Sequence, residues 1–181
     1  MAGQFEFDQK KFSELVVYLA KRLPPEAALG RVKLMKLLMH SDFAAYARLG
    51  RPITGATYEK WEFGHFAREW VLTEKDLHAV GAITERRENY YGYQLRHLVA
   101  LRDPDLSSFS EDEIAIVEGA IKQYGHESAK YLSDLAHREH GWRLVQMKDV
   151  IPYNTVFLGS GSVSESDIRR GEELASLHGW N

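Results

Sequence analysis

The sequence of 181 residues contains no cysteine. This absence excludes a disulfide framework, a zinc site built on thiolates and a thiol nucleophile, and it fits a reducing compartment. No run reaches the roughly 18 consecutive apolar residues that cross a bilayer, and the opening MAGQFEF lacks the basic and apolar stretches of a secretory signal. We therefore expect a cytoplasmic protein that is neither secreted nor embedded in a membrane.

An excess of positive charge is also missing, because the formal net charge is -3. Domains that bind nucleic acid usually have a strongly basic balance. Nucleic acid is therefore disfavoured as a partner, and any such binding would need a local basic patch. What the chain does have is 44% hydrophobic residues, which is enough for a chain of this length to bury the core of one domain.

The longest apolar helix is predicted over residues 31–49. Leucines and methionines make it apolar around more than half of its circumference, which places it in the middle of a domain. Gly50 follows where a helix end favours a left-handed residue, and Pro52 prevents the helix from continuing. Gly55 then provides the turn into the next element. The rest of the chain is expected to pack around this scaffold.

A strand is predicted over residues 57–63, with Trp61 and Phe63 expected to point inward. Residues 82–102 alternate apolar and polar side chains around a turn at 89–92, which indicates a hairpin. Because an isolated two-stranded hairpin is marginal in water, we expect the hairpin and the strand to form one small antiparallel sheet.

The remaining helices show local boundary signals. Asp8 is placed to cap a first helix that stops at Pro24. A third helix is expected from Phe66 to Val80, where apolar residues recur at helical spacing. Ser110 and Glu113 have the spacing of a capping box, which predicts the start of a further helix.

These elements predict a mainly α fold with a small antiparallel β-sheet (α+β). We expect a single compact domain with a central apolar helix, a hairpin and a C-terminal appended helix. The GSGS stretch at 159–162 is interpreted as a flexible linker, and Ser164 can cap a last helix. The domain is therefore assigned to residues 1–158, and the linker and C-terminal helix to residues 159–181.

Two blocks of the sequence match a family pattern. The first block reads KLxKLL, then YxRxGRPITGxTY, then a strand that ends in glycine; its residues are Lys33, Leu34, Lys36, Leu37, Leu38, Asp42, Tyr46, Gly50, Arg51, Pro52, Ile53, Thr54, Gly55, Thr57, Tyr58 and Gly64. The second block comprises Ser133, Leu135, His137 and Trp142, followed by Ile151, Pro152 and Tyr153. Together they resemble the Panacea domain of SocA-like antitoxins, over about residues 9–158.

The resemblance implies an antitoxin that binds and neutralises a cognate protein toxin encoded by an adjacent gene, or in some relatives delivers that toxin to a protease. The sequence leaves open whether the chain also forms a homodimer. The chain departs from the family in one place, because the family commonly has Gly-Pro-x-Pro after the strand and here Gly64 is followed by His65, Phe66 and Ala67.

Catalytic and metal-binding patterns are weak. Imidazole and carboxylate ligands suit zinc or iron, and His126, His137, Glu139 and His140 lie close together in the sequence, but without HExxH spacing. We interpret His137 instead as a half-buried histidine that donates to a backbone carbonyl and packs near Trp142. No catalytic residue, metal or cofactor is expected, and an enzyme is disfavoured for want of a convergent polar site.

Five large aromatic side chains lie within residues 58–70. Most are expected in the core, but Tyr, Trp and Arg dominate interface hot spots, so some could line a partner groove. The candidate partner-binding residues are Tyr58, Lys60, Trp61, His65, Phe66, Arg68 and Trp70. Structural roles are assigned to Gly50, Pro52, Gly55, Gly64, His137 and Trp142.

A second function class is left open by the predicted hairpin at 82–102. It carries a local basic patch of Arg86, Arg87, Arg96, His97 and Arg102. A helix followed by a hairpin is the outline of a winged helix, whose wing could track phosphates. The alternative function is therefore a nucleic-acid-binding regulator that uses Arg86 and Arg87, although Glu85 and Glu88 balance the charge on this hairpin.

Overall fold

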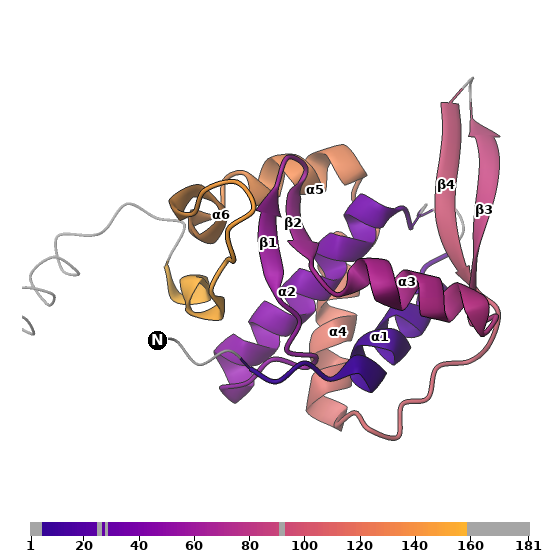
Figure 1. The fold of residues 1–181 in the computed structure, drawn as a ribbon, viewed down its shortest axis with the longest axis horizontal. Helices are drawn as coiled ribbons and strands as arrows, with labels where there is room; N and C mark the ends of the chain where they lie inside the picture. Colours follow the sequence, from indigo (N-terminus) through magenta and orange to yellow (C-terminus); the bar gives the residue numbers. More distant parts are fainter. Residues whose placement is uncertain (1–4, 25–26, 28, 91–92, 159–181) are drawn as a thin grey trace, which may run out of the picture.

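The computed structural model describes residues 5–24, 27, 29–90 and 93–158. Five helices and two β-hairpins surround one long central helix in this part of the chain (Figure 1). In chain order, the elements are α1 (Gln9–Arg22), α2 (Arg31–Leu49), β1 (Tyr58–Trp61), β2 (Gly64–Ala67), α3 (Trp70–Ala79), β3 (Ile83–Tyr90), β4 (Tyr93–Ala100), α4 (Glu111–Tyr124), α5 (Ala129–Ala136), α6 (His140–Leu144) and the 3-10 helix η2 (Tyr153–Phe157). The predicted α+β fold class is confirmed.

The central element is α2, as the apolar pattern predicts. Leu34, Leu37 and Leu38 are fully buried, and the helix contacts α1, α4, α5, β2 and η2. Removing this apolar surface from water is the main driving force for assembling the domain. The helix ends at Gly50, which has a φ of 73° and donates its N–H to the Tyr46 carbonyl.

The helix starts that the sequence predicts are confirmed by their capping bonds. The Asp8 carboxylate accepts from the Lys11 N–H at 2.9 Å, at the start of α1. The reciprocal bonds between Ser110 and Glu113 at the start of α4 measure 3.2 Å and 2.9 Å. Each bond satisfies an amide that the helix itself leaves without an acceptor.

The prediction of one sheet is wrong, because the two hairpins form two separate two-stranded sheets. β1 pairs with β2 from Tyr58↔Ala67 to Trp61↔Gly64. The other edge of β1 is occupied by residues 148–151, since the Lys60 N–H donates to the Asp149 carbonyl and the Ile151 N–H to the Tyr58 carbonyl. No edge of β1 is therefore left for the β3–β4 hairpin, which projects from the body as an arm (Figure 1).

The predicted inward direction of Trp61 and Phe63 is also wrong. Their exposed fractions are 40% and 62%, whereas that of Tyr58 is 1%. The strand ends at Trp61, and the chain reverses before Gly64, which has a φ of 110°. Tyr58 takes the inward position because its hydroxyl bonds to a buried carboxylate on α2.

The third predicted helix starts later than expected, because Phe66 belongs to β2 and α3 begins at Trp70. Residues 66 and 67 are held in the ladder with β1, and the Glu69 carboxylate accepts from the Thr57 N–H at 3.0 Å. The helix end at Gly81 is confirmed, with a φ of 65°.

The predicted GSGS linker and the last helix from Ser164 lie outside the described residues. The division at residue 158 therefore stays a prediction. Among the helices that the structure describes, none combines the length and apolar character needed to cross a membrane.

Candidate partner-binding site

The corner between α2 and β1 is fixed by one buried carboxylate. Asp42 on α2 accepts from the Thr54 N–H at 2.7 Å, the Thr54 hydroxyl at 2.5 Å and the Tyr58 hydroxyl at 2.8 Å. Burial raises the pKa of Asp42 to about 6, although these hydrogen bonds act in the opposite direction. The Asp, Thr and Tyr of the first sequence block are therefore one hydrogen-bonded unit that positions β1.

The turn before β1 is closed by the N-terminal segment. Gly55 has a φ of 69°, and a Cβ on it would lie 2.3 Å from the Glu6 carbonyl oxygen. The Asp8 N–H donates to the Thr54 carbonyl at 2.8 Å, and Pro52 is buried beside the turn. Only glycine meets both the backbone and the space requirement at position 55.

The hairpin of β1 and β2 lies directly against a buried lysine. The exposed fraction of Lys36 is 0%, and a Cβ on Gly64 would lie 1.5 Å from its Nζ. This Nζ has no hydrogen-bond partner within the described residues, and burial lowers the pKa of Lys36 to about 8. The other lysine of the KLMKLL segment, Lys33, is also internal, since it donates to the carbonyls of Ala27 and Gly125.

A small polar cluster surrounds Lys36 under the hairpin. Glu139 lies 3.1 Å from His65 Nε2 and 3.7 Å from His40 Nε2. Burial raises the pKa of Glu139 to about 7 and lowers that of His40 to about 3. Both imidazoles are therefore neutral near pH 7, because the pKa of His65 is also far below its usual value through burial.

No metal site is found among the described residues, either at this cluster or around His126, His137 and His140. The adjoining hollow, bordered by His40, His65 and Glu139, has a volume of about 170 Å³. This volume is below the several hundred Å³ typical of small-molecule sites. Lys36 and Glu139 can carry protons inside the domain, but the hollow beside them offers little space for a substrate.

The turn of the β1–β2 hairpin is held by side chains of the second sequence block. Three successive carbonyls of the turn each accept one hydrogen bond: Trp61 from Trp142 Nε1 at 3.2 Å, Glu62 from His137 Nε2 at 2.9 Å and Phe63 from the Ser133 hydroxyl at 3.2 Å. The His137 and Trp142 rings also pack with centroids 4.3 Å apart. His137 therefore makes the two contacts expected from the sequence, a bond to a backbone carbonyl and packing against Trp142. Because a carbonyl oxygen only accepts, this bond requires a proton on Nε2.

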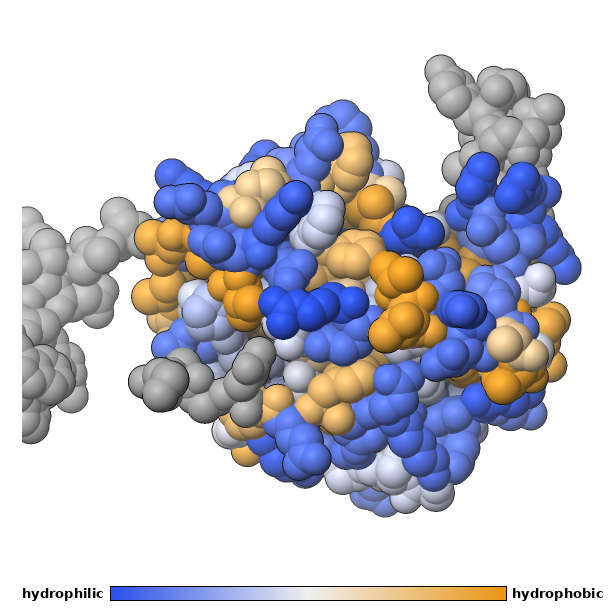
Figure 2. Space-filling model, viewed as in Figure 1, coloured by the Kyte–Doolittle hydropathy of each residue, from blue (hydrophilic) through white to orange (hydrophobic). Residues whose placement is uncertain are grey.

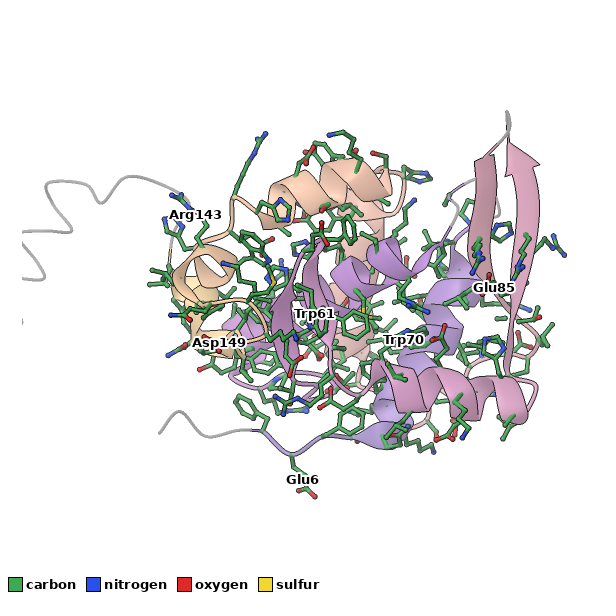
Figure 3. All side chains as sticks on the ribbon, turned by 45° about the horizontal axis from the view of Figure 1, so that its top comes forward. Glu6, Trp61, Trp70, Glu85, Arg143 and Asp149 are labelled. Carbon is green, nitrogen blue, oxygen red and sulfur yellow. The ribbon has the colours of Figure 1, made fainter. Side chains whose placement is uncertain are left out.

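The turn carbonyls bond to side chains of the domain, and the aromatic side chains of Trp61 and Phe63 are exposed to solvent. A groove of about 560 Å³ runs between the hairpin, the start of α2 and the start of α3. Its apolar lining comprises Val32, Met35, Trp61, Phe63, Phe66 and Val71. Figure 3 shows Trp61 beside the two strands, and Figure 2 shows hydrophobic surface over the start of α3. We call the surface formed by these six side chains the hairpin face.

A second hollow, of about 430 Å³, adjoins the first on the side of α5. It is bordered by Ala129 and Ser133 of α5 and by His137, which directly follows this helix. The two hollows share Val32, Glu62 and Phe63. Phe63 therefore stands as a ridge between two depressions.

The two sequence blocks thus form one structural unit, which comparison with known families identifies. A model of the family described as antitoxin SocA-like, Panacea domain, matches residues 34–143, more than half of the chain. The chain belongs to this antitoxin family. No curated protein and no solved structure matches it. The match runs from α2 to α6 and so includes Asp42, the hairpin and all three donors to its turn.

In this Panacea domain, the sequence-predicted partner-binding residues occupy different depths. Trp61, Phe66 and Arg68 line the groove, and His65 forms part of its buried floor. Tyr58 and Trp70 have exposed fractions of 1% and 0% and lie beneath the surface. Lys60 is directed to the other side, where Nζ donates to the Val145 carbonyl at 2.8 Å and lies 4.0 Å from the Trp142 ring centroid.

Four apolar residues of the groove are not among the predicted partner-binding residues: Val32, Met35, Phe63 and Val71. Val32 and Met35 belong to a helix that is apolar on most sides, so the pattern alone does not separate the groove from the core. Phe63 was expected inside because strand alternation assumes that the strand continues to residue 63.

The basic patch on the β3–β4 arm is partly neutralised. Glu85 lies 3.5 Å from both Arg87 Nε and Arg96 Nε, and Figure 3 shows Glu85 on the arm. His97 is buried, and Arg102 forms a bidentate pair with Glu14 at 2.8 Å and 2.6 Å. Of the five predicted basic residues, only Arg86, Arg87 and Arg96 are therefore exposed on the arm.

Proposed function

We propose that this chain is the antitoxin of a toxin–antitoxin pair and that it neutralises its cognate protein toxin by direct binding through the hairpin face. The family match supports the antitoxin role. The exposed aromatic side chains of Trp61 and Phe63 support the choice of surface, since large aromatic residues supply much of the binding free energy at interfaces. The toxin is expected to be encoded by the adjacent gene.

The observation that carries this proposal is the set of three side-chain bonds to the turn carbonyls. A binding surface that is already ordered loses less conformational entropy when it meets its partner. Tyr58 and Trp70 contribute from beneath by packing the hairpin and α3 in place. The proposed function requires binding only, and no bond is made or broken by the chain.

Co-expression tests the proposal. Expression of the adjacent gene alone should stop growth, and expression of both genes should restore it. The two proteins should then co-purify in a fixed ratio of one to one or a symmetric multiple. Direct neutralisation would be contradicted if the product of the adjacent gene did not stop growth, or if growth were restored without formation of a complex.

Measurement of toxin half-life in the same cells separates simple occupation from delivery to a protease. Under the proposal, toxin bound to the antitoxin accumulates as a stable complex. Toxin that disappears within minutes of antitoxin expression would instead indicate an adaptor that leads to degradation.

A further inference from the structure

The hairpin face has a charge pattern that specifies its occupant. The three cations around the two hollows each have an acidic partner: Arg31 pairs with Glu74 at 3.5 Å, Arg68 with Glu59 at 2.7 Å and Lys130 with Asp134 at 2.9 Å. The carboxylate of Glu62 has no ion pair or hydrogen bond within the described residues. One unbalanced negative charge therefore lies where the two hollows meet, beside the exposed ring of Phe63.

Most main-chain N–H and C=O groups of β1 are already hydrogen-bonded within the domain, so few are available to a partner. One edge of β1 pairs with β2, and the other bonds to residues 148–151. The Ala67 N–H of β2 is directed at the Met35 sulfur of α2. Addition of a partner strand to β1 is thus blocked, which favours recognition through side chains.

One recurring mode of recognition lays the apolar face of an amphipathic helix into an apolar groove, with anchor residues three or four positions apart. The two hollows on either side of Phe63 suit two such apolar anchors. Glu62 lies between them and attracts a cation.

We propose that the hairpin face takes an amphipathic helix of the toxin, in which apolar residues flank a lysine or arginine that pairs with Glu62. This inference rests on the proposed function, and it adds the chemistry of the partner segment. The apolar anchors provide most of the affinity, and the cation sets the register of the helix on the ridge.

The test measures binding of the toxin from the adjacent gene to purified full-length antitoxin by calorimetry at two salt concentrations. Glu62→Gln should weaken binding about 3- to 10-fold and reduce its salt dependence, and Glu62→Lys should weaken it more than about 30-fold, because it opposes like charges. Glu6→Lys is the matched control, since its side chain points into solvent away from the face (Figure 3). This control should bind as the wild type does.

A second pair of variants tests the apolar anchors. Phe63 and Phe157 have nearly equal exposed fractions, 62% and 64%, but Phe157 lies on η2. Phe63→Ala should weaken binding more than about 30-fold, as loss of a hot spot does. Phe157→Ala should leave it unchanged.

Each outcome separates the inference from the function on which it rests. If wild-type antitoxin forms the complex but both Glu62 variants bind equally well, or if Glu62→Lys binds more tightly, the charge assignment is overturned while the antitoxin role stands. If Phe157→Ala loses binding and Phe63→Ala does not, the occupied surface is the α6–η2 region. Absence of any complex with the wild type contradicts the proposed function itself. Thermal melting of each variant verifies that it is folded.

Discussion

The two β-hairpins of this domain are both antiparallel strand pairs, but one is packed against the rest of the domain and the other projects from it. The β1–β2 hairpin has strands of four residues. It is held by α2, by residues 148–151 and by the side chains of Ser133, His137 and Trp142. The β3–β4 hairpin has strands of eight residues and projects as an arm (Figure 1). The short hairpin carries exposed aromatic rings, and the long one carries exposed arginines.

We infer that the geometry of the β1–β2 hairpin is fixed by the groups that bond to its backbone. A two-stranded hairpin has little stability of its own. For β1–β2, the missing stability comes from tertiary hydrogen bonds and from the contact of Gly64 with Lys36. The embedded hairpin can therefore display apolar side chains in a fixed geometry, which is the property that a binding surface needs.

The largest expected effect comes from removing the close contact between the hairpin and α2. Gly64→Ala places a Cβ 1.5 Å from Lys36 Nζ in a residue with a φ of 110°. We expect a loss of about 3 kcal/mol or more in the free energy of unfolding, measured with urea. Gly81→Ala is the matched control, because Gly81 has a φ of 65° but nothing within 4 Å of a Cβ. It should cost only about 1 kcal/mol. Equal losses would show that the contact with Lys36 has no importance.

Replacing the buried ammonium of Lys36, whose Nζ has no hydrogen-bond partner within the described residues, should stabilise the domain. Burial lowers the pKa of Lys36 from 10.5 to about 8, so the folded state binds fewer protons than the unfolded state between these two pH values. Wild-type stability should therefore rise from pH 8 to pH 10.5, by about 3 kcal/mol. Lys36→Met should be more stable than the wild type at pH 7. Its rise in stability between pH 8 and pH 10.5 should be smaller than that of the wild type, with the remainder coming from Lys33, whose pKa is also lowered by burial.

Lys11→Met is the control for that experiment. Lys11 is also largely buried, but its Nζ lies 2.8 Å from both Glu113 oxygens. Its removal leaves a buried carboxylate with one fewer partner and should destabilise the domain. A Lys36→Met protein that is less stable at pH 7 would show that the ammonium has a partner after all.

A smaller effect is expected for the donors to the turn. His137→Ala removes the hydrogen bond to the Glu62 carbonyl and the ring contact with Trp142. We expect a loss of about 1 to 2 kcal/mol and faster amide hydrogen exchange in β1 and β2. His126→Ala, at an exposed histidine, should change neither quantity. Unchanged exchange in His137→Ala would mean that the turn is ordered without this donor.

The smallest effect is expected on the arm. Arg86 and Arg87 are exposed, so the double substitution to alanine should alter stability by less than about 0.5 kcal/mol. It should also leave toxin binding unchanged. Salt-dependent binding of duplex DNA that is lost in this variant would instead support the nucleic-acid-binding alternative.

The boundaries of several elements could be predicted from the sequence because the signals are local. Asp8, Ser110 and Glu113 cap helices through residues three positions away, and Gly50 ends α2 through its own backbone conformation. The direction of Trp61 and Phe63 could not be predicted in this way. It depends on the bond from Tyr58 to Asp42 and on the pairing of β1 with residues 148–151, which are distant in the sequence.

The contacts of the candidate site could likewise be predicted from the sequence only in part. The resemblance to the family identified Ser133, His137 and Trp142 as one block, but not that they bond to consecutive carbonyls of a turn about 70 to 80 residues earlier in the chain. From the sequence, Lys36 is only one residue of the KLMKLL helix segment. Its burial against Gly64 in the structure shows that its side chain is internal. Such contacts are set by tertiary packing, which no local pattern encodes.

We expect the β1–β2 hairpin, and not the β3–β4 arm, to be the surface that meets the toxin. Amide hydrogen exchange of the antitoxin, measured with and without the purified toxin, tests this claim most directly. The claim predicts new protection within residues 59–66 and at the start of α2, with exchange in β3 unchanged. Protection that appears in β3 or in η2, with none in residues 59–66, would contradict it.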